Sequence, residues 1–314
     1  TYLFSKIQRY YWFGFLSIPF VVGCGIYERF FLFLKSFFIS FLPRGIYQPI
    51  LCMLFIYLAQ AYVEPSPTNA LLCYAASFLI ALLISVIYGY FSGFKLSTKF
   101  DDKDKSQWQV SGLYYTFSTL IIKSSPSFAI FFLERFGTVE ASVGLFAAIT
   151  YLTYGFHLLT KPFDSYLKPS IATLYSKQDI SGLQNEVNTI NKMRWCIIAA
   201  LFMILVVFGE HLLLDYGQSY TSGYLPLVTL AFFMLLQYLG QTSHELLNYT
   251  GNQQYLSYIM AGQCVMIVVV AGLCIPTYGI WGAVLAQGLP CVLATFASAY
   301  TLRKKTNIKA YLYF

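Results

Sequence analysis

Long apolar stretches separated by short polar breaks run along almost the whole chain. Nine of them are roughly 18 to 25 residues long, the length that an α-helix needs to cross a hydrocarbon core of about 30 Å. These predicted spans cover residues 10–27, 45–62, 70–91, 112–133, 141–160, 195–214, 224–248, 255–276 and 278–300. The pattern therefore predicts an all-α, polytopic membrane helix bundle with about nine transmembrane helices.

Two longer polar breaks divide the predicted bundle. The break 92–111 separates three spans from six, and we interpret it as a cytoplasmic loop between two lobes. The break 161–194 has an apolar spacing that suits a helix along the inner membrane surface. We therefore expect an N-terminal lobe over residues 1–91, a C-terminal lobe over 112–302 and a cytoplasmic tail over 303–314.

The composition agrees with a membrane protein and gives no sign of a metal site. Hydrophobic residues make up 58% of the chain and charged residues only 11%, more apolar surface than a water-soluble domain could bury. All seven cysteines fall in or beside the spans, which is typical of packing residues. Asp101, Asp102 and Asp104 alternate with lysines, as in a solvated loop. We therefore predict no metal site and no cofactor.

The positive charges predict the orientation. Sixteen of the 20 lysines and arginines lie on one side of the predicted membrane, and positively charged loops stay in the cytoplasm. The C-terminus is therefore expected in the cytoplasm, and the net charge of +7 needs no nucleic-acid partner. The loops on the opposite side are too short to display catalytic residues.

Three spans carry polar residues at the three- and four-residue spacing that aligns side chains on one helix face, and the span 70–91 shows a milder version. The aligned residues are Thr116, Thr119, Lys123 and Ser127; Thr150, Thr153, His157 and Lys161; and Gln237, Gln241, His244 and Asn248. A polar group in hydrocarbon costs several kcal/mol, so such faces either form hydrogen bonds between helices or line a water-filled cavity. Both interpretations stay open for the hydroxyl groups.

Lys123 favours the cavity. It lies 11 residues into its span, about 16 Å deep at 1.5 Å per residue, and no acidic residue occurs at matching depth in the nine predicted spans. A structural salt bridge is the alternative. We expect Lys123 to bind an anion with Thr116, Thr119 and Ser127 on the same face. His157, Gln237, Gln241 and His244 are further candidates, the two histidines at the cytoplasmic mouth.

Several segments resemble the polysaccharide-exporter, or O-antigen flippase, branch of the superfamily that also contains multidrug and toxin extrusion antiporters. They are SFFISFLPRGIYQPIL, FAIFFLERFGTVEASVGLFAAITYL, KPSIATLYSKQDISGLQ, HELLNYTGNQ and IPTYGIWGAVLAQG. Their order and spacing match that branch over nearly the whole chain. By this match the first predicted span corresponds to a fourth helix, so about three helices would be absent and the first lobe incomplete.

The resemblance implies two helical lobes around a cavity that opens alternately to either side. The cargo would be an undecaprenyl-pyrophosphate-linked oligosaccharide, flipped across the bacterial inner membrane for lipopolysaccharide or another surface polysaccharide. The expected partners are this lipid-linked oligosaccharide, membrane lipids, a polysaccharide polymerase and chain-length proteins. The resemblance implies a transporter and not an enzyme.

Two other functions compete with this interpretation. A multidrug and toxin antiporter for cations would be expected to carry acidic residues deep in its cavity, where this chain has a lysine. A membrane-embedded polymerase or ligase would need catalytic residues at one face, generally on a sizeable loop.

Overall fold

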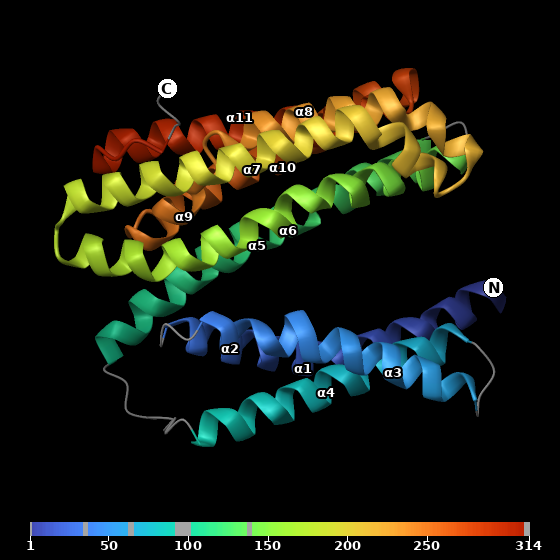
Figure 1. The fold of residues 1–314 in the computed structure, drawn as a ribbon, viewed down its shortest axis with the longest axis horizontal. Helices are drawn as coiled ribbons and strands as arrows, with labels where there is room; N and C mark the ends of the chain where they lie inside the picture. Colours follow the sequence, from blue (N-terminus) through green and yellow to red (C-terminus); the bar gives the residue numbers. More distant parts are fainter. Residues whose placement is uncertain (1, 34–36, 62–65, 92–101, 137–139, 311–314) are drawn as a thin grey trace. The chain divides into compact units, whose positions relative to one another are not determined.

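The computed structural model describes residues 2–33, 37–61, 66–91, 102–136 and 140–310, and the side chains of residues 2–14, 32–33, 37–38, 67, 102–108 and 140–141 lie outside this description. The described ranges are helical almost throughout (Figure 1). The chain divides into two compact units, an N-terminal unit, Thr1–Phe100, and a C-terminal unit, Asp101–Phe314.

The N-terminal unit is built on the packing of α1 (Tyr2–Phe33) along α4 (Pro67–Phe91). Between them in the chain come α2 (Phe37–Leu42), a π-helical turn (Pro43–Tyr47) and α3 (Gln48–Gln60), which also packs on α4. Cys24, Phe78 and Ala81 form the buried core of this unit, because they are the small and apolar residues on the facing sides of α1 and α4.

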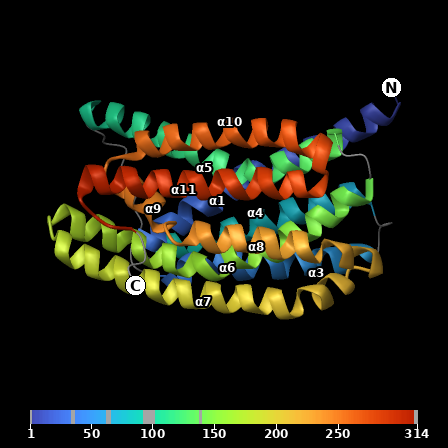
Figure 2. The same ribbon diagram turned by 90° about the horizontal axis from the view of Figure 1, so that it is seen from above.

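The C-terminal unit begins with three long helices, α5 (Asp102–Phe136), α6 (Glu140–Ser176) and α7 (Ile180–Leu214). A 3-10 turn (Gln218–Gly223) leads into α8 (Tyr224–Tyr238), α9 (Thr242–Tyr249), α10 (Gln253–Tyr278) and α11 (Ile280–Thr306). Both views show the long helices of this unit running side by side, with the short α9 near one end (Figures 1 and 2).

Close packing of α10 against α11 depends on Gly282. A Cβ atom at this position would lie 2.4 Å from the carbonyl carbon and oxygen of Cys274, so no larger residue fits without a shift of the backbone. Small residues at a helix contact allow two backbones to approach. This contact holds one end of the helix pair together.

Eight helices in the described part of the chain are long and apolar enough to cross a membrane. They are Ile39–Gln60, Thr68–Phe91, Gln109–Phe136, Ser142–Ser176, Ile180–Leu214, Gln218–Tyr238, Gln253–Tyr278 and Ile280–Thr306. Each overlaps one of the nine predicted spans. The other prediction, 10–27, lies within α1, but the first side chains of α1 are outside the description. The predicted all-α membrane bundle is confirmed.

Helices run past three of the predicted boundaries. Residues 102–111 of the predicted inter-lobe loop are the first turns of α5, whereas 92–101 lie outside the described residues. The predicted break 161–194 is formed by direct extensions of α6 and α7, which are long because their apolar faces pack on each other. The predicted tail starts at 303, yet α11 continues to Thr306.

The turn between α6 and α7 is short and capped by a side chain. Asp179 accepts a hydrogen bond from the backbone N–H of Gly182 at 2.8 Å, which satisfies one of the free donors at the start of α7. The Ser181 hydroxyl also donates to Asp179 at 3.0 Å. The backbone N–H and this hydroxyl together lower the pKa of the Asp179 carboxyl.

The predicted span 224–248 is interrupted. Helix α8 ends at Tyr238 and α9 starts at Thr242. Between them the backbone hydrogen bonds join residues three apart, as from Gly240 N–H to the Gln237 carbonyl at 3.2 Å. A Cβ atom on Gly240 would lie 3.1 Å from the Thr295 methyl group of α11. The chain therefore turns where it passes closest to α11, next to the polar residues described below.

Candidate functional site

The predicted polar face of α5 is accessible. Thr116, Lys123 and Ser127 are exposed and Thr119 is half-buried, so the spacing of these residues does place them on one side of the helix. Pro126 lies within α5, which continues through it to Phe136. The face offers one ammonium group and three hydroxyl groups.

A second set of hydroxyl groups lies on the opposite side of α5 and was not among the predicted residues. Ser118 and Ser125 are buried, and Gln263 of α10 donates to the Ser125 hydroxyl at 3.4 Å and to the Cys291 sulfur at 3.1 Å. Ser257 of α10 donates to the Tyr114 carbonyl at 2.7 Å. These contacts hold α5, α10 and α11 together, which is the role that the sequence left open for hydroxyl groups.

The predicted polar face of α6 is only partly accessible. Thr153 is buried and donates back to the carbonyls of Ile149 at 3.1 Å and Thr150 at 3.0 Å, so its hydroxyl is satisfied within its own helix. His157 is exposed, and its ring lies 5.5 Å from that of Tyr154. Thr153 is therefore satisfied by hydrogen bonds, one of the alternatives left open for the hydroxyl groups, and the role of His157 at a cavity mouth stays a prediction.

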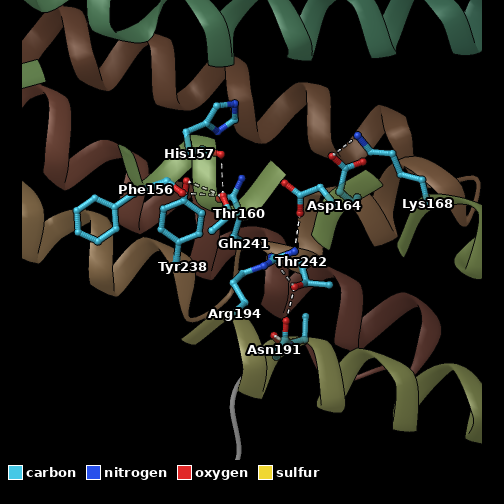
Figure 3. Close-up of polar contacts among 12 residues, drawn as sticks. Phe156, His157, Thr160, Asp164, Lys168, Asn191, Arg194, Tyr238, Gln241 and Thr242 are labelled. Atoms are coloured by element: carbon cyan, nitrogen blue, oxygen red, sulfur yellow. Dashed lines mark hydrogen bonds and ion pairs between the residues drawn. The ribbon is translucent and has the colours of Figure 1, made fainter. Parts of the chain in front are cut away.

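Two charged residues extend this stripe of α6. Asp164 lies three residues after Lys161, and Lys168 lies four residues after Asp164, so both continue the same spacing. The Asp164 carboxylate lies 2.5 Å from Nη2 of Arg194 on α7, and Lys168 lies 3.2 Å from the Glu245 carboxylate on α9. Three helices therefore meet through two ion pairs at one end of the unit (Figure 3).

Arg194 is the centre of a chain of contacts. Its side chain is only 1% exposed, and Nη1 donates to the Thr242 hydroxyl at 3.0 Å. Thr242 in turn donates to the Asn191 side-chain oxygen, and Figure 3 shows the sequence of contacts from Asp164 through Arg194 and Thr242 to Asn191. Asn191 donates to the Ala310 carbonyl at 3.0 Å. Removing one partner of such a buried pair typically costs about 3–5 kcal/mol.

An aromatic contact lies one turn before Asp164 on α6. Thr160 is 3.3 Å from the Tyr238 hydroxyl, and the rings of Tyr238 and Phe156 stack with centroids 6.3 Å apart. Tyr238 is the last residue of α8 before the interruption. This contact fixes the end of α8 against α6.

The three candidates from the predicted span 224–248 have different environments. Gln237 and Gln241 are half-buried, and Gln237 donates to Gln241 at 3.2 Å across the interruption. His244 is buried, and neither ring nitrogen has a hydrogen-bond partner among the described residues. The prediction that His244 lies open at a mouth of the cavity is therefore wrong. The turn at 239–241 places this residue against protein. The spacing of polar residues could not predict this, because it assumes an uninterrupted helix.

Charged side chains of α5 and α6 act on the same residue, His157. The charges of Asp164, Lys123, Lys161 and Lys168 all act on His157, so Lys123 of α5 contributes to the field at α6. The Asp164 charge also acts on His244. Four basic side chains and two carboxylates lie in this region, because Glu245 pairs with Lys168 as Asp164 pairs with Arg194, so the net charge of the region is positive. In the described part of the chain, no group of histidine, cysteine and carboxylate side chains could hold a metal ion.

Comparison with known proteins places the fold. No protein-family model and no curated protein matches the sequence. Solved structures do match. The match to the Vibrio cholerae MATE transporter VcmN has a TM-score of 0.77 and 16% identity, and it covers 98% of this chain and 72% of the VcmN chain. An outward-facing multidrug resistance MATE family transporter of the MOP superfamily has TM-score 0.69 and 16% identity over 86% of this chain.

A third match is a MOP superfamily transporter from Pyrococcus furiosus, with TM-score 0.68 and 16% identity over 86% of this chain. The chain spans 62% of the length of the first MATE structures that it matches. All these identities lie far below those at which function carries over, whereas the TM-scores define a common architecture. The chain has the same multi-pass helical fold as these solved structures.

Proposed function

We propose that this chain belongs to a transporter that flips an anionic, pyrophosphate-linked lipid oligosaccharide across a membrane. The observation that carries the proposal is the positive region around His157, which is formed by Lys123 on α5 with Lys161 and Lys168 on α6. A cation in a partly desolvated site attracts a multiply charged anion more strongly than it would in water. The hydroxyl groups of Thr116, Thr119 and Ser127, with the amides of Gln237 and Gln241, would bind sugar hydroxyls.

The charge pairing supports an anionic cargo over a cationic one. The two carboxylates of this region, Asp164 and Glu245, each lie against a basic side chain within the described structure. A site for cationic drugs would need a carboxylate available to the ligand. The lysine-rich face of α5 and α6 favours phosphate groups instead.

A cationic drug is the second candidate cargo, because several matched structures are named as MATE or multidrug resistance transporters. The Pyrococcus furiosus protein favours the anionic cargo, since it is described as having a binding pocket of reverse polarity that suggests a different function. The MOP architecture therefore accommodates more than one pocket polarity.

The proposed orientation places the turn between α6 and α7 in the cytoplasm of a bacterial cell. The lysines and arginines of 161–194 and 303–309 favour that side. Lys161 and Lys168 then lie toward the inner leaflet, where a lipid-linked precursor would enter, and Lys123 lies deeper in its span. The polysaccharide polymerase and chain-length proteins are proposed partners on the basis of the family resemblance alone.

The test is a set of lysine variants of the full-length protein in its native cells. Lys123→Met should abolish surface polysaccharide and cause lipid-linked oligosaccharide to accumulate, whereas Lys123→Arg should retain part of the export because the charge remains. Lys192→Met on α7 is the matched control, since Lys192 is an exposed lysine distant in sequence from the proposed face. Protein abundance is measured for each variant. Normal export by Lys123→Met would show that the charge is not needed.

A further inference from the structure

The ion pair between Arg194 and Asp164 lies beside the positive region without belonging to its accessible face. We infer that Arg194 is a specificity-determining residue that acts through Asp164: by neutralising this carboxylate, it makes the end of the transport site selective for anions. The inference rests on the proposed function and extends it, because it assigns the polarity of the site to a buried residue that touches no cargo.

The position of Asp164 makes its charge matter to a ligand. Asp164 is seven residues, about two turns, after His157 on the same face of α6. Lys161 and Lys168 lie on either side of it in that stripe. Its charge acts on His157, which is exposed, so a ligand bound at His157 would experience the same field.

Asp164 is the more exposed partner of the ion pair. The Asp164 side chain is 13% exposed and that of Arg194 only 1%, so the carboxylate is on the more accessible side of the pair and the guanidinium is behind it. Anything approaching along α6 therefore meets a carboxylate whose charge is cancelled from within the protein. Without Arg194, the same position would present a bare negative charge.

The surroundings keep Arg194 in place. Thr242 accepts from Nη1 at 3.0 Å while Nη2 contacts Asp164, and Thr242 is itself bonded to Asn191. These contacts come from α9 and α7, so the guanidinium cannot follow the carboxylate toward solvent.

The inference predicts opposite effects for the two single substitutions. Arg194→Met leaves Asp164 unpaired and adds a negative charge to the site, whereas Asp164→Asn leaves Arg194 unpaired and adds a positive one. The double substitution Asp164→Asn with Arg194→Met has no charge at either position and should behave like the wild type. A pair that served stability alone would give two single variants that lose binding in the same direction.

The experiment measures binding to the purified full-length protein in lipid nanodiscs. The two probes are farnesyl pyrophosphate, a lipid pyrophosphate, and tetraphenylphosphonium, a lipophilic cation. Arg194→Met should weaken farnesyl pyrophosphate binding and strengthen tetraphenylphosphonium binding, each on the order of ten-fold for one unit charge in a partly screened site. Asp164→Asn should shift both affinities the other way, and the double variant should restore the wild-type ratio.

Thr189→Val is the matched control. Thr189 is an exposed residue of α7 whose hydroxyl donates to the Asn185 carbonyl of the same helix at 2.9 Å, so its removal changes no charge and should leave the ratio of the two affinities unchanged. Equal ratios in the wild type and both single variants, or a loss of farnesyl pyrophosphate binding in both, would overturn the inference.

The outcome for the wild type tests the proposed function separately. A wild-type protein that prefers tetraphenylphosphonium would contradict the anionic cargo. The inference about Arg194 would still be decided in that case, because Arg194→Met must strengthen tetraphenylphosphonium binding and Asp164→Asn must weaken it.

Discussion

Gln184 on α7 binds the backbone of Lys309 with both ends of its side-chain amide. Its Nε2 donates to the Lys309 carbonyl at 2.8 Å, and its Oε1 accepts from the Lys309 N–H at 2.7 Å. The neighbouring residues Ile308 and Ala310 are fully buried in the core of the C-terminal unit. The segment after α11 is therefore a packed part of the structure, and hydrogen bonds from α7 side chains attach it to α7.

Gln184→Ala should loosen this segment. The two hydrogen bonds to Lys309 are lost, each contributing about 0.5–1.5 kcal/mol, together with the one that Gln184 donates to Asn188 within α7. Amide hydrogen exchange at Ile308 and Lys309 should become faster by at least ten-fold while exchange in α10 is unchanged. Asn185→Ala is the control, because Asn185 is the exposed neighbour on α7. Equal exchange in the wild type and Gln184→Ala would mean that burial of Ile308 and Ala310 alone holds the segment.

Gly282→Ala should destabilise the contact between α10 and α11. The new methyl group would meet backbone atoms of Cys274 and Ile275 at 2.4–2.6 Å, and backbone cannot move aside as a flexible side chain can. Overpacking of this kind typically costs about 1–3 kcal/mol. Thermal unfolding in detergent should therefore occur at a lower temperature.

Gly272→Ala on α10 provides the opposite case. Nothing lies within 4 Å of a Cβ atom there, and alanine favours a helix by about 0.5–1 kcal/mol over glycine. This variant should be as stable as the wild type or more so. A lower unfolding temperature for Gly272→Ala than for Gly282→Ala would contradict the packing described here.

His244→Leu should be tolerated and His244→Asp should not. The ring is buried with both nitrogens unpartnered within the described structure, so a leucine of similar volume should change stability by less than about 1.5 kcal/mol. An aspartate would bury a second negative charge in the field of Asp164, without a counter-ion. Unfolding temperature and export are measured together. Loss of export in a stable His244→Leu protein would restore His244 as a candidate that contacts the cargo.

His157 should respond to charge, because it is exposed in the positive region. His157→Asp should weaken export more than His157→Asn, since only the aspartate repels a pyrophosphate. The comparison is made at equal protein abundance. The same loss in both variants would indicate that hydrogen bonding or packing, and not charge, is the role of this residue.

Cysteine labelling tests the orientation. Ser181 follows the turn between α6 and α7, and Ser219 lies beyond the other end of α7; both are exposed. In a variant without the seven native cysteines, Ser181→Cys should resist an impermeant thiol reagent in intact cells and Ser219→Cys should react. The reverse pattern would invert the proposed topology. Ser106 would be a third position, although its side chain is outside the described residues.

The spans could be predicted from sequence because crossing a membrane is a local property of about 20 consecutive residues. The interruption at Gly240 could not, since the apolar run continues through it and a single glycine is tolerated in a helix. Thr295 of α11 lies against Gly240 at this turn. The contact is visible in three dimensions alone.

Candidate site residues were predictable to the extent that spacing reports a shared helix face. Spacing placed Lys123 and Ser127 together on α5, but it could not say whether a face meets protein or water, so His157 and His244 looked alike. The pair of Asp164 with Arg194 depends on a turn that brings residues 30 positions apart into contact. A signal was nevertheless present, because Asp164 and Lys168 continue the stripe of His157 and Lys161.

The helices of the α6–α7 hairpin are longer than the hydrocarbon core of a bilayer is thick. A helix of 37 residues is about 55 Å long, against about 30 Å of hydrocarbon, and the two helices run without interruption to a turn at 177–179. The turn is therefore joined by continuous helix to the rest of the C-terminal unit. A rigid helical protein fused in register at this turn would keep a fixed angle to the membrane helices, and would give electron cryomicroscopy an alignment marker for a chain of only 314 residues.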